Sequence, residues 1–284
     1  MKYIQFKSKD KLIFNAIVLG NTKAKKAYIF IHGLGGDMFS RFELNEKLSK
    51  KSTIVLSFNN RGQGIINKFK KEDAKSEKGY KSKLLGSALE SFTDSKYDIQ
   101  GAVDYLKSQG IKEIYLVGHS TGCQKSIYYL SKINDSAVRG AVLLAPISDY
   151  SSIINSMDSK AYNRALKEAL KLKKAKEADK LLPSDAWFAP ISAQRFLSLY
   201  TPNSTEEIFS YGSKKPATLL RKVNKKLLVL LGEKDEHNDR DVNDLKSWFE
   251  ENTKKEDKVF VVKEANHGFQ GQEKKVADIV HKYF

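Results

Sequence analysis

The segment 114–124, with the sequence IYLVGHSTGCQ, constrains the fold more than any other part of the chain. An apolar run at 114–117 ends at the motif Gly-His-Ser-Thr-Gly, and a stretch compatible with a helix, 124–130, follows at once. The order strand, sharp turn, helix places Ser120 at the apex of the turn, and the glycines two residues before and after it leave room for a tight backbone. This context predicts a nucleophile elbow, the alternative being an ordinary turn between a strand and a helix.

Buried strands and helices alternate along most of the chain. Short continuous apolar runs of this kind are typical of strands that are covered on both faces of a parallel sheet. Residues 65–93 break the pattern, because they are polar, lysine-rich and poorly periodic, and we expect a long surface loop there. The pattern predicts an α/β fold with a mainly parallel sheet of about eight strands flanked by helices; the expected strands are 3–6, 12–19, 27–31, 53–58, 114–117, 140–145, 227–231 and 258–262.

The segment 147–216 has a different character from the sequence on either side. It holds apolar residues at helical spacing among many lysines, then a concentration of aromatic residues without a run of strand length. We predict a helical lid inserted between two parts of one core, 1–146 and 217–284, because an aromatic segment over the site would exclude water. The alternative is a plain helical elaboration packed on the core.

Two glycine-containing motifs carry a resemblance to a known superfamily. GHSTG at 118–122 and HGLGG at 32–36 resemble motifs of the α/β-hydrolase superfamily. GHSTGCQ at 118–124, AP-x-SD at 145–149 and PISAQRFLSLYTP at 190–202 further resemble a serine-hydrolase-like branch, the DUF1749 family. The resemblance implies an α/β-hydrolase fold and a nucleophilic serine.

A serine nucleophile needs a base within hydrogen-bond reach and an acid that orients the base. In this fold the chain order is serine, acid, histidine. His267 follows the last predicted strand, and we take it as the base, because the other four histidines lie in the glycine motifs, the acid loop or the last helix: His32, His119, His237 and His281. The superfamily's G-x-x-D loop indicates Asp235 as the acid, and its rivals in the same loop are Glu233, Asp239 and Asp241.

The negative charge that develops on the substrate oxygen needs backbone N–H donors. We expect one from Thr121, the residue after the nucleophile. The resemblance implies the other from Leu34, the residue after His-Gly, while His32 braces that loop by hydrogen bonding. Arg61 is expected to buttress the core near the site.

The predicted pocket points to a carboxylic ester with a small to medium apolar or aryl group. That expectation depends on the aromatic residues of the predicted lid. Thioesters, amides and peptides pass through the same oxyanion and stay open, as does a non-catalytic, ligand-binding member of the fold. The candidate substrate-binding residues are His119, Trp187, Phe188, Arg195, Phe196 and Tyr200.

The net charge of +16 raises the question of a polyanionic partner. Only seven of the 50 basic residues are arginines and the lysines are scattered, so we expect no specific nucleic-acid binding. A near match to a calcium loop at 239–250 has Asp244 in place of the required glycine, and no other motif indicates a metal or cofactor. The absence of an N-terminal apolar run and the single Cys123 predict a cytoplasmic protein without a membrane span; the oligomeric state stays open.

Overall fold

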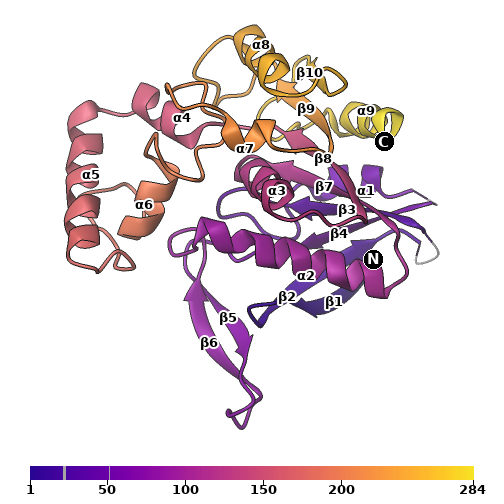
Figure 1. Cartoon of the computed structure of the whole chain (residues 1–284), viewed down its shortest axis with the longest axis horizontal. Helices are drawn as coiled ribbons and strands as arrows, with labels where there is room; N and C mark the ends of the chain where they lie inside the picture. The colour runs from indigo at the N-terminus through magenta and orange to yellow at the C-terminus, as the bar shows by residue number, and fades with distance from the viewer. Residues whose placement is uncertain (22–23, 51) are drawn as a thin grey trace.

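The centre of the molecule is one mixed β-sheet. A computed structural model describes residues 1–21, 24–50 and 52–284. Among these residues the sheet has ten strands in the order β10-β9-β8-β7-β3-β4-β2-β5-β6, with β1 paired to β2 (Figure 1). The strands are β1 (Lys2–Lys7), β2 (Leu12–Leu19), β3 (Lys26–Ile31), β4 (Thr53–Phe58), β5 (Asn67–Glu72), β6 (Tyr80–Leu85), β7 (Glu113–His119), β8 (Val138–Leu144), β9 (Lys226–Gly232) and β10 (Lys258–Val262).

The six strands from β10 to β4 are parallel to one another. Their apolar runs are buried on both sides, as expected for strands that are covered by helices on both faces. The register pairs Ile31 of β3 with Gly118 of β7, so both strands end at the same level. The loop after β3 and the turn after β7 therefore lie side by side at the carboxyl edge of the sheet.

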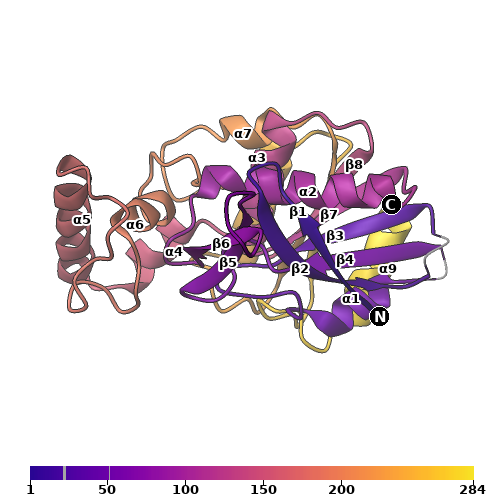
Figure 2. The same cartoon turned by 90° about the horizontal axis from the view of Figure 1, so that it is seen from below.

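Helices cover both faces of this parallel sheet. Figure 2 shows α2 and α3 on one face and α1 and α9 on the other. Each face buries its own apolar cluster, which is why the strands lack an alternating polar side. The helices of the core are α1 (Phe42–Leu48), α2 (Ser95–Ser108), α3 (Thr121–Lys132), α7 (Thr218–Arg221), α8 (Val242–Asn252) and α9 (Glu273–Tyr283).

The predicted loop at 65–93 is instead a β-hairpin that extends the sheet. Strands β5 and β6 pair along their whole length, and β5 joins β2 through Ile13 and Lys70. The expectation of a loop was wrong. Only Phe69 and Leu85 of these two strands are buried, so the sequence shows no alternation of apolar and polar residues. The strands are held together by backbone hydrogen bonds, which the sequence does not reveal. The hairpin accounts for the difference between ten strands and the eight expected.

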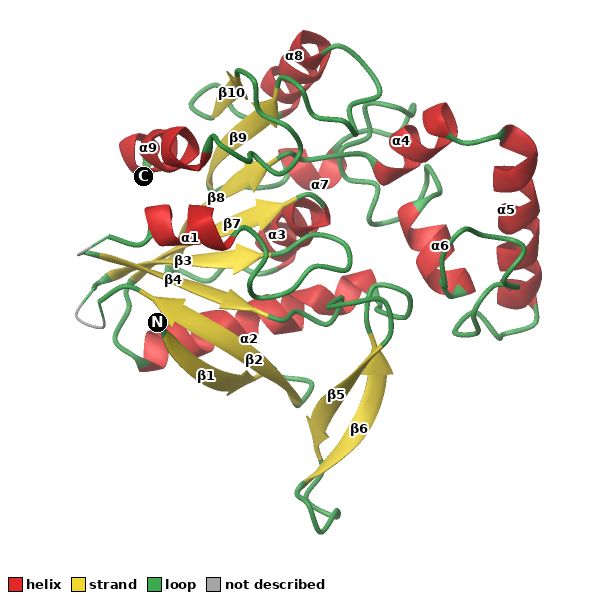
Figure 3. Cartoon of the chain, turned by 180° about the vertical axis from the view of Figure 1, so that it is seen from behind, coloured by secondary structure: helices red, strands yellow, loops and turns green. Residues whose placement is uncertain are grey.

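The segment 147–216 lies between β8 and β9 and forms the left side of the molecule in Figure 1. It holds α4 (Asp149–Ser156), α5 (Ser159–Lys174) and α6 (Ala193–Leu199). Figure 3 shows α5 and α6 beside each other, away from the strands. They share an apolar cluster of their own that includes Ala165, Trp187 and Phe196. None of the described helices has the length and apolar character that crossing a lipid bilayer would require.

Candidate active site

Ser120 lies in the turn between β7 and α3 in a rare backbone conformation. Its φ is 53° and its ψ is −126°. A non-glycine residue in this region of the Ramachandran plot is strained, and it persists only where the surrounding structure holds it. The Ser120 amide donates to the carbonyl of Leu144 at 3.0 Å, which fixes the turn to the end of the neighbouring strand β8.

The two glycines of the motif are required by close backbone contacts. A Cβ on Gly118 would lie 2.4 Å from the carbonyl oxygen of Gly122. A Cβ on Gly122 would lie 2.1 Å from the carbonyl oxygen of Ile31, at the end of β3. No side chain fits at these distances, so glycines two residues before and after Ser120 are what let strand, turn and helix approach one another.

The loop after β3 lies directly against the Ser120 side chain. A Cβ added to Gly33 would lie 2.9 Å from Ser120 Cβ and 3.1 Å from the carbonyl oxygen of His119. His32 holds this loop from beneath: it is buried, its Nδ1 donates to the Gly33 carbonyl at 2.8 Å, and its Nε2 accepts the Asn60 amide at 3.1 Å. The loop is thus positioned by an internal hydrogen-bond network.

A Gly33→Ala substitution is expected to lower kcat/KM about a hundredfold for a reaction in which Ser120 is the nucleophile. The new methyl group displaces either Ser120 or the loop by a fraction of an ångström or more. Steady-state kinetics together with thermal unfolding measure this effect. An activity close to that of the wild type would show that the loop does not set the geometry of Ser120.

His267 and Asp235 form a hydrogen-bonded pair on two neighbouring loops. His267 follows β10 and Asp235 follows β9, and the parallel pairing of these strands brings the loops together. His267 Nδ1 donates to Asp235 Oδ2 at 2.8 Å, and Oδ1 is 3.0 Å from the same nitrogen. Both side chains are largely shielded, with 12% and 5% exposure. Because Nδ1 faces the carboxylate, Nε2 is the nitrogen left for another partner.

The three rival acids of this region have other partners. Asp239 pairs with Arg240 and Ser151, and Asp241 caps α8 through the Asn243 amide. Glu233 accepts the amide of Glu264 at 2.9 Å. Glu236 accepts the His267 backbone amide at 2.9 Å, and Asp235 is the carboxylate of this loop that bonds the His267 ring.

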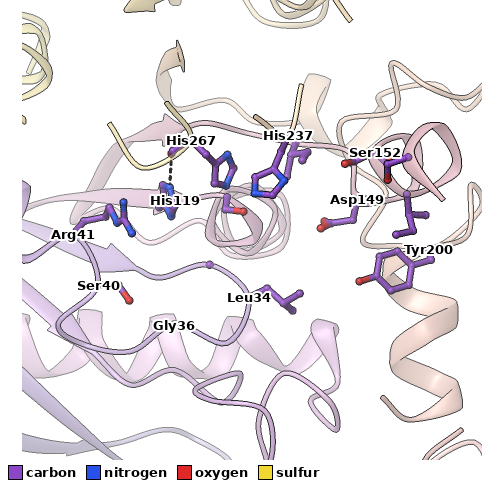
Figure 4. A pocket seen from close by; sticks show the side chains of 15 residues that line it. Leu34, Gly36, Ser40, Arg41, His119, Asp149, Ser152, Tyr200, His237 and His267 are labelled. Atoms are coloured by element: carbon purple, nitrogen blue, oxygen red, sulfur yellow. Dashed lines mark hydrogen bonds between the residues drawn. The ribbon is translucent and has the colours of Figure 1, made fainter. Parts of the chain in front are cut away.

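Ser120 and His267 line one cavity of about 470 Å³ (Figure 4). The cavity opens at the carboxyl edge of the sheet, between the core and the segment 147–216. Most of the lining residues carry polar or titratable side chains, yet polar and apolar atoms contribute nearly equally to the cavity surface. The residues around it are Gly33, Leu34, Gly36, Ser40, Arg41, His119, Ser120, Ile147, Asp149, Ser152, Ile153, Ser156, Tyr200, His237 and His267.

The amides of Leu34 and Thr121 stand beside Ser120. Leu34 follows Gly33 and lines the cavity, while Thr121 is the fully buried first residue of α3. Within the described residues, neither amide donates a hydrogen bond to a protein acceptor. A buried backbone N–H without a partner is rare, so the Thr121 amide is available to a ligand atom.

His119 contributes to the cavity through its ring and supports the loop of His267. Its Nε2 lies 2.9 Å from the His267 carbonyl oxygen, the contact that is dashed in Figure 4. Burial and the neighbouring His267 lower the pKa of His119 to about 3. Burial, followed by Lys125, lowers the pKa of His32 to about 4. Both rings are therefore neutral near pH 7.

The titration of these two histidines makes the stability depend on pH. Between their usual pKa of 6.5 and their folded values the unfolded chain binds protons that the native state does not, so their contribution to the free energy of unfolding falls as the pH decreases, by up to about 1.4 kcal/mol per pH unit for each group. Asp149 and Glu207 act in the opposite direction, because burial raises their pKa to about 8 and about 7. His119→Gln isolates the contribution of one histidine: by urea unfolding we expect the variant to gain stability relative to the wild type between about pH 7.5 and about pH 5. A stability difference between the two proteins that stays constant over this range would contradict the assignment.

The structure separates the predicted substrate-binding residues. His119 and Tyr200 line the cavity. Trp187 and Phe196 pack on each other and on Tyr200 inside the inserted segment, and Phe188 is 69% exposed. Trp187 and Phe196 thus belong to the apolar core of the segment and Phe188 to its surface, and none of the three is among the residues around the cavity.

Two arginines and the cysteine likewise lie buried in the interior of the protein. Arg195 is fully buried and pairs with Glu90 and Glu206. Arg61 is buried against Asp98. Cys123 is buried, and burial raises the pKa of its thiol well above the usual value.

Sequence reasoning missed several residues that line the cavity, above all Asp149, Arg41 and His237. Arg41 Nη1 donates to the Gly268 carbonyl at 3.0 Å, beside His267. The ring of His237 lies 4.5 Å from that of His267. Asp149 follows the end of β8, so the rule that ligands bind at the carboxyl edge of such a sheet could have indicated it.

Comparisons with known proteins agree with this architecture. The family model described as "Protein of unknown function (DUF1749)" matches residues 77–283. No curated protein matches the sequence. Similar solved structures include the siderophore hydrolase EstB from Aspergillus fumigatus, with 19% identity and a TM-score of 0.71 over 100% of this chain and 96% of that chain.

Two further similar structures come from bacteria. The esterase EaEST from Exiguobacterium antarcticum has 17% identity and a TM-score of 0.62 over 99% of each chain. Est1E from Butyrivibrio proteoclasticus, solved with ferulic acid bound, has 16% identity and a TM-score of 0.65 over 100% of this chain and 97% of that chain. At such identities the likeness shows the fold, and it confirms the predicted α/β-hydrolase fold class.

Proposed function

The chain belongs to the DUF1749 family and has the α/β-hydrolase fold, and from this premise we propose that it is a serine hydrolase that cleaves carboxylic esters. The observation that carries the proposal is the juxtaposition of Ser120 and His267 at one cavity, with His267 hydrogen-bonded to Asp235 on its far side. The named esterases and hydrolases of the same fold support the choice of reaction.

The reaction begins with attack of Ser120 Oγ on the ester carbonyl carbon. His267 Nε2 takes the hydroxyl proton and Asp235 holds the ring through Nδ1–H and stabilises the imidazolium. The amides of Leu34 and Thr121 donate to the oxyanion of the tetrahedral intermediate. As the intermediate collapses, His267 gives its proton to the leaving alcohol, and an acyl group remains on Ser120.

Deacylation repeats the same steps with water. His267 removes a proton from the water while its oxygen attacks the acyl carbon, and the second oxyanion is held by the same two amides. Collapse breaks the bond to Ser120 Oγ, which takes the proton back from His267, and the carboxylic acid leaves. The net reaction consumes one water for each ester bond.

The segment 147–216 is proposed to act as a lid over this cavity. Its residues Asp149, Ser152 and Tyr200 face the cavity opposite the loop of Leu34, and Figure 4 shows the two sides. Exclusion of water by such a segment strengthens the electrostatic contacts at the reacting atoms. The cavity volume fits a small to medium ester.

A panel of substrates tests the reaction class. We expect p-nitrophenyl esters of short and medium acyl chains to be cleaved faster than acyl-coenzyme A thioesters and amino-acid anilides. A clear preference for the thioesters or the anilides would replace the ester assignment and leave the Ser120 mechanism in place.

A further inference from the structure

The side of the cavity formed by the inserted segment carries a carboxylate that the proposed mechanism does not use. Asp149 is the first residue of α4 and lines the cavity. Its Oδ2 accepts the Gln124 amide at 2.9 Å. In the part of the chain that the structure describes, no side chain bonds its other oxygen, and no cation forms an ion pair with it.

The neighbouring buried acids differ from Asp149 in having strong partners of their own. Glu90 is paired with both Lys125 and Arg195, and Glu206 is paired with Arg195 and bonded by Ser198. Glu207 accepts the Ser148 hydroxyl at 2.7 Å. Asp149 is thus the carboxylate of this group that combines access to the cavity with the lack of a cation.

Tyr200 stands next to Asp149 on the same side of the cavity. Figure 4 shows the two side chains close together, pointing toward the space in front of His237 and Leu34. The Tyr200 ring is held by Trp187 and Phe196, whose centroids lie 5.1 and 5.5 Å away. A fixed aromatic ring beside a carboxylate is an arrangement that favours an organic cation, because both groups attract positive charge.

We propose that Asp149 and Tyr200 form a subsite for the ammonium group of a substrate that carries a primary amine, so that the enzyme prefers amino-substituted esters. The inference rests on the proposed ester hydrolysis and names the class of its substrate. The ammonium completes the hydrogen bonding of Asp149 and lies against the Tyr200 ring, while the ester carbonyl reaches Ser120 in the same cavity.

The pKa of Asp149 couples binding at this subsite to pH. Burial, followed by the Glu206 carboxylate, raises the pKa of Asp149 to about 8; Arg195 opposes the rise and Glu207 adds to it. Gln124 and Tyr200 are the uncharged polar groups beside the carboxyl, and His237 lines the same cavity. A bound ammonium favours the ionised carboxylate, so binding is coupled to loss of a proton.

Matched pairs of esters test the proposal. We compare p-nitrophenyl 6-aminohexanoate with p-nitrophenyl heptanoate, p-nitrophenyl 3-aminopropanoate with the butanoate, and 6-aminohexyl acetate with heptyl acetate; within each pair an ammonium replaces a methyl group. We expect kcat/KM to favour the amino ester roughly ten- to hundredfold in at least one pair, through a lower KM, as for a hydrogen bond to a charged group.

The Asp149→Asn variant removes the charge and keeps an acceptor for the Gln124 amide. We expect it to abolish the preference of kcat/KM for the amino ester over the neutral ester, whereas Asp278→Asn, at an exposed position of α9, should leave both the preference and the rates as in the wild type. The ratio of amino to neutral ester should rise with pH through about 8 in the wild type and stay flat in Asp149→Asn. Taking a ratio cancels the ionisation of His267.

Failure of this inference differs from failure of the proposed function. Hydrolysis of neutral and amino esters at equal rates, or a preference that survives Asp149→Asn, overturns the ammonium subsite and leaves ester hydrolysis in place. If no ester is cleaved, the melting temperature of the protein with hexylammonium decides. A rise in the melting temperature supports the subsite if Asp149→Asn removes the rise and hexanol does not produce it. The absence of a rise overturns the subsite.

Discussion

Replacement of Ser120 by alanine is expected to lower kcat for ester hydrolysis by about 10⁴- to 10⁶-fold. The substitution removes the oxygen that forms the acyl-enzyme, so only substrate binding and the amides of Leu34 and Thr121 remain to accelerate attack by water. The smaller side chain should leave the fold intact, although alanine must adopt the strained backbone with φ of 53°. Burst-phase and steady-state kinetics with a p-nitrophenyl ester measure the effect.

The control for this experiment is Ser247→Ala. Ser247 lies on the exposed surface of α8 and its hydroxyl bonds a carbonyl of the same helix. We expect its kinetics to match those of the wild type. Turnover by Ser120→Ala within tenfold of the wild-type value would rule out an acyl-enzyme on Ser120.

Arg195→Met is expected to lower the free energy of unfolding by about 3–5 kcal/mol. The guanidinium is fully buried, lies 3.1 Å from Glu90, pairs with Glu206 and donates to the Ser87 carbonyl at 3.2 Å. Its removal leaves Glu206 buried without a cation, whereas Glu90 keeps Lys125. Because Arg195 belongs to α6 and Glu90 to the core, the loss should also loosen the inserted segment.

Urea unfolding measures this change, with Arg164→Met as the matched control. Arg164 lies on the exposed face of α5, and a surface substitution of this kind should change the stability by no more than about 0.5 kcal/mol. A cost below about 1 kcal/mol for Arg195→Met would contradict the claim that Glu206 depends on Arg195 as its cation.

The elbow was predictable from sequence because its chemistry leaves few choices. Only glycine tolerates the contacts at 118 and 122, and the strand and helix around them follow from local apolar periodicity. The contact between His267 and Asp235 was predictable because each follows a continuous apolar strand, and loops at the carboxyl edge of a parallel sheet meet.

The hairpin and the residues that line the cavity were harder to predict from the sequence. The strands β5 and β6 are held by backbone pairing, which leaves little trace in side chains when only Phe69 and Leu85 are buried. We expected the aromatic residues of the inserted segment to line the pocket. Trp187 and Phe196 instead pack on each other, because the segment has an apolar core of its own and these large side chains fill it. The spacing of aromatic residues in the sequence does not distinguish side chains that fill a core from side chains that line a pocket.

Asp149 illustrates the same limit for polar groups. Its position after β8 can be read from the sequence. Whether it can bind a ligand depends on which of the neighbouring acidic residues form ion pairs with the buried basic residues. Arg195 and Lys125 lie far from Glu90 along the chain. Only the tertiary structure shows that they neutralise Glu90 and Glu206 and that Asp149, among the residues the structure describes, has no ion pair.

Covalent labelling by a fluorophosphonate tests the central claim, that Ser120 is an activated nucleophile, most directly. The reagent phosphonylates a serine whose proton is taken by an adjacent base, and peptide mass spectrometry locates the adduct. We predict one adduct, on Ser120, that forms far more slowly in His267→Ala. An adduct on another residue, or none on Ser120 in the folded wild-type protein, would contradict the account.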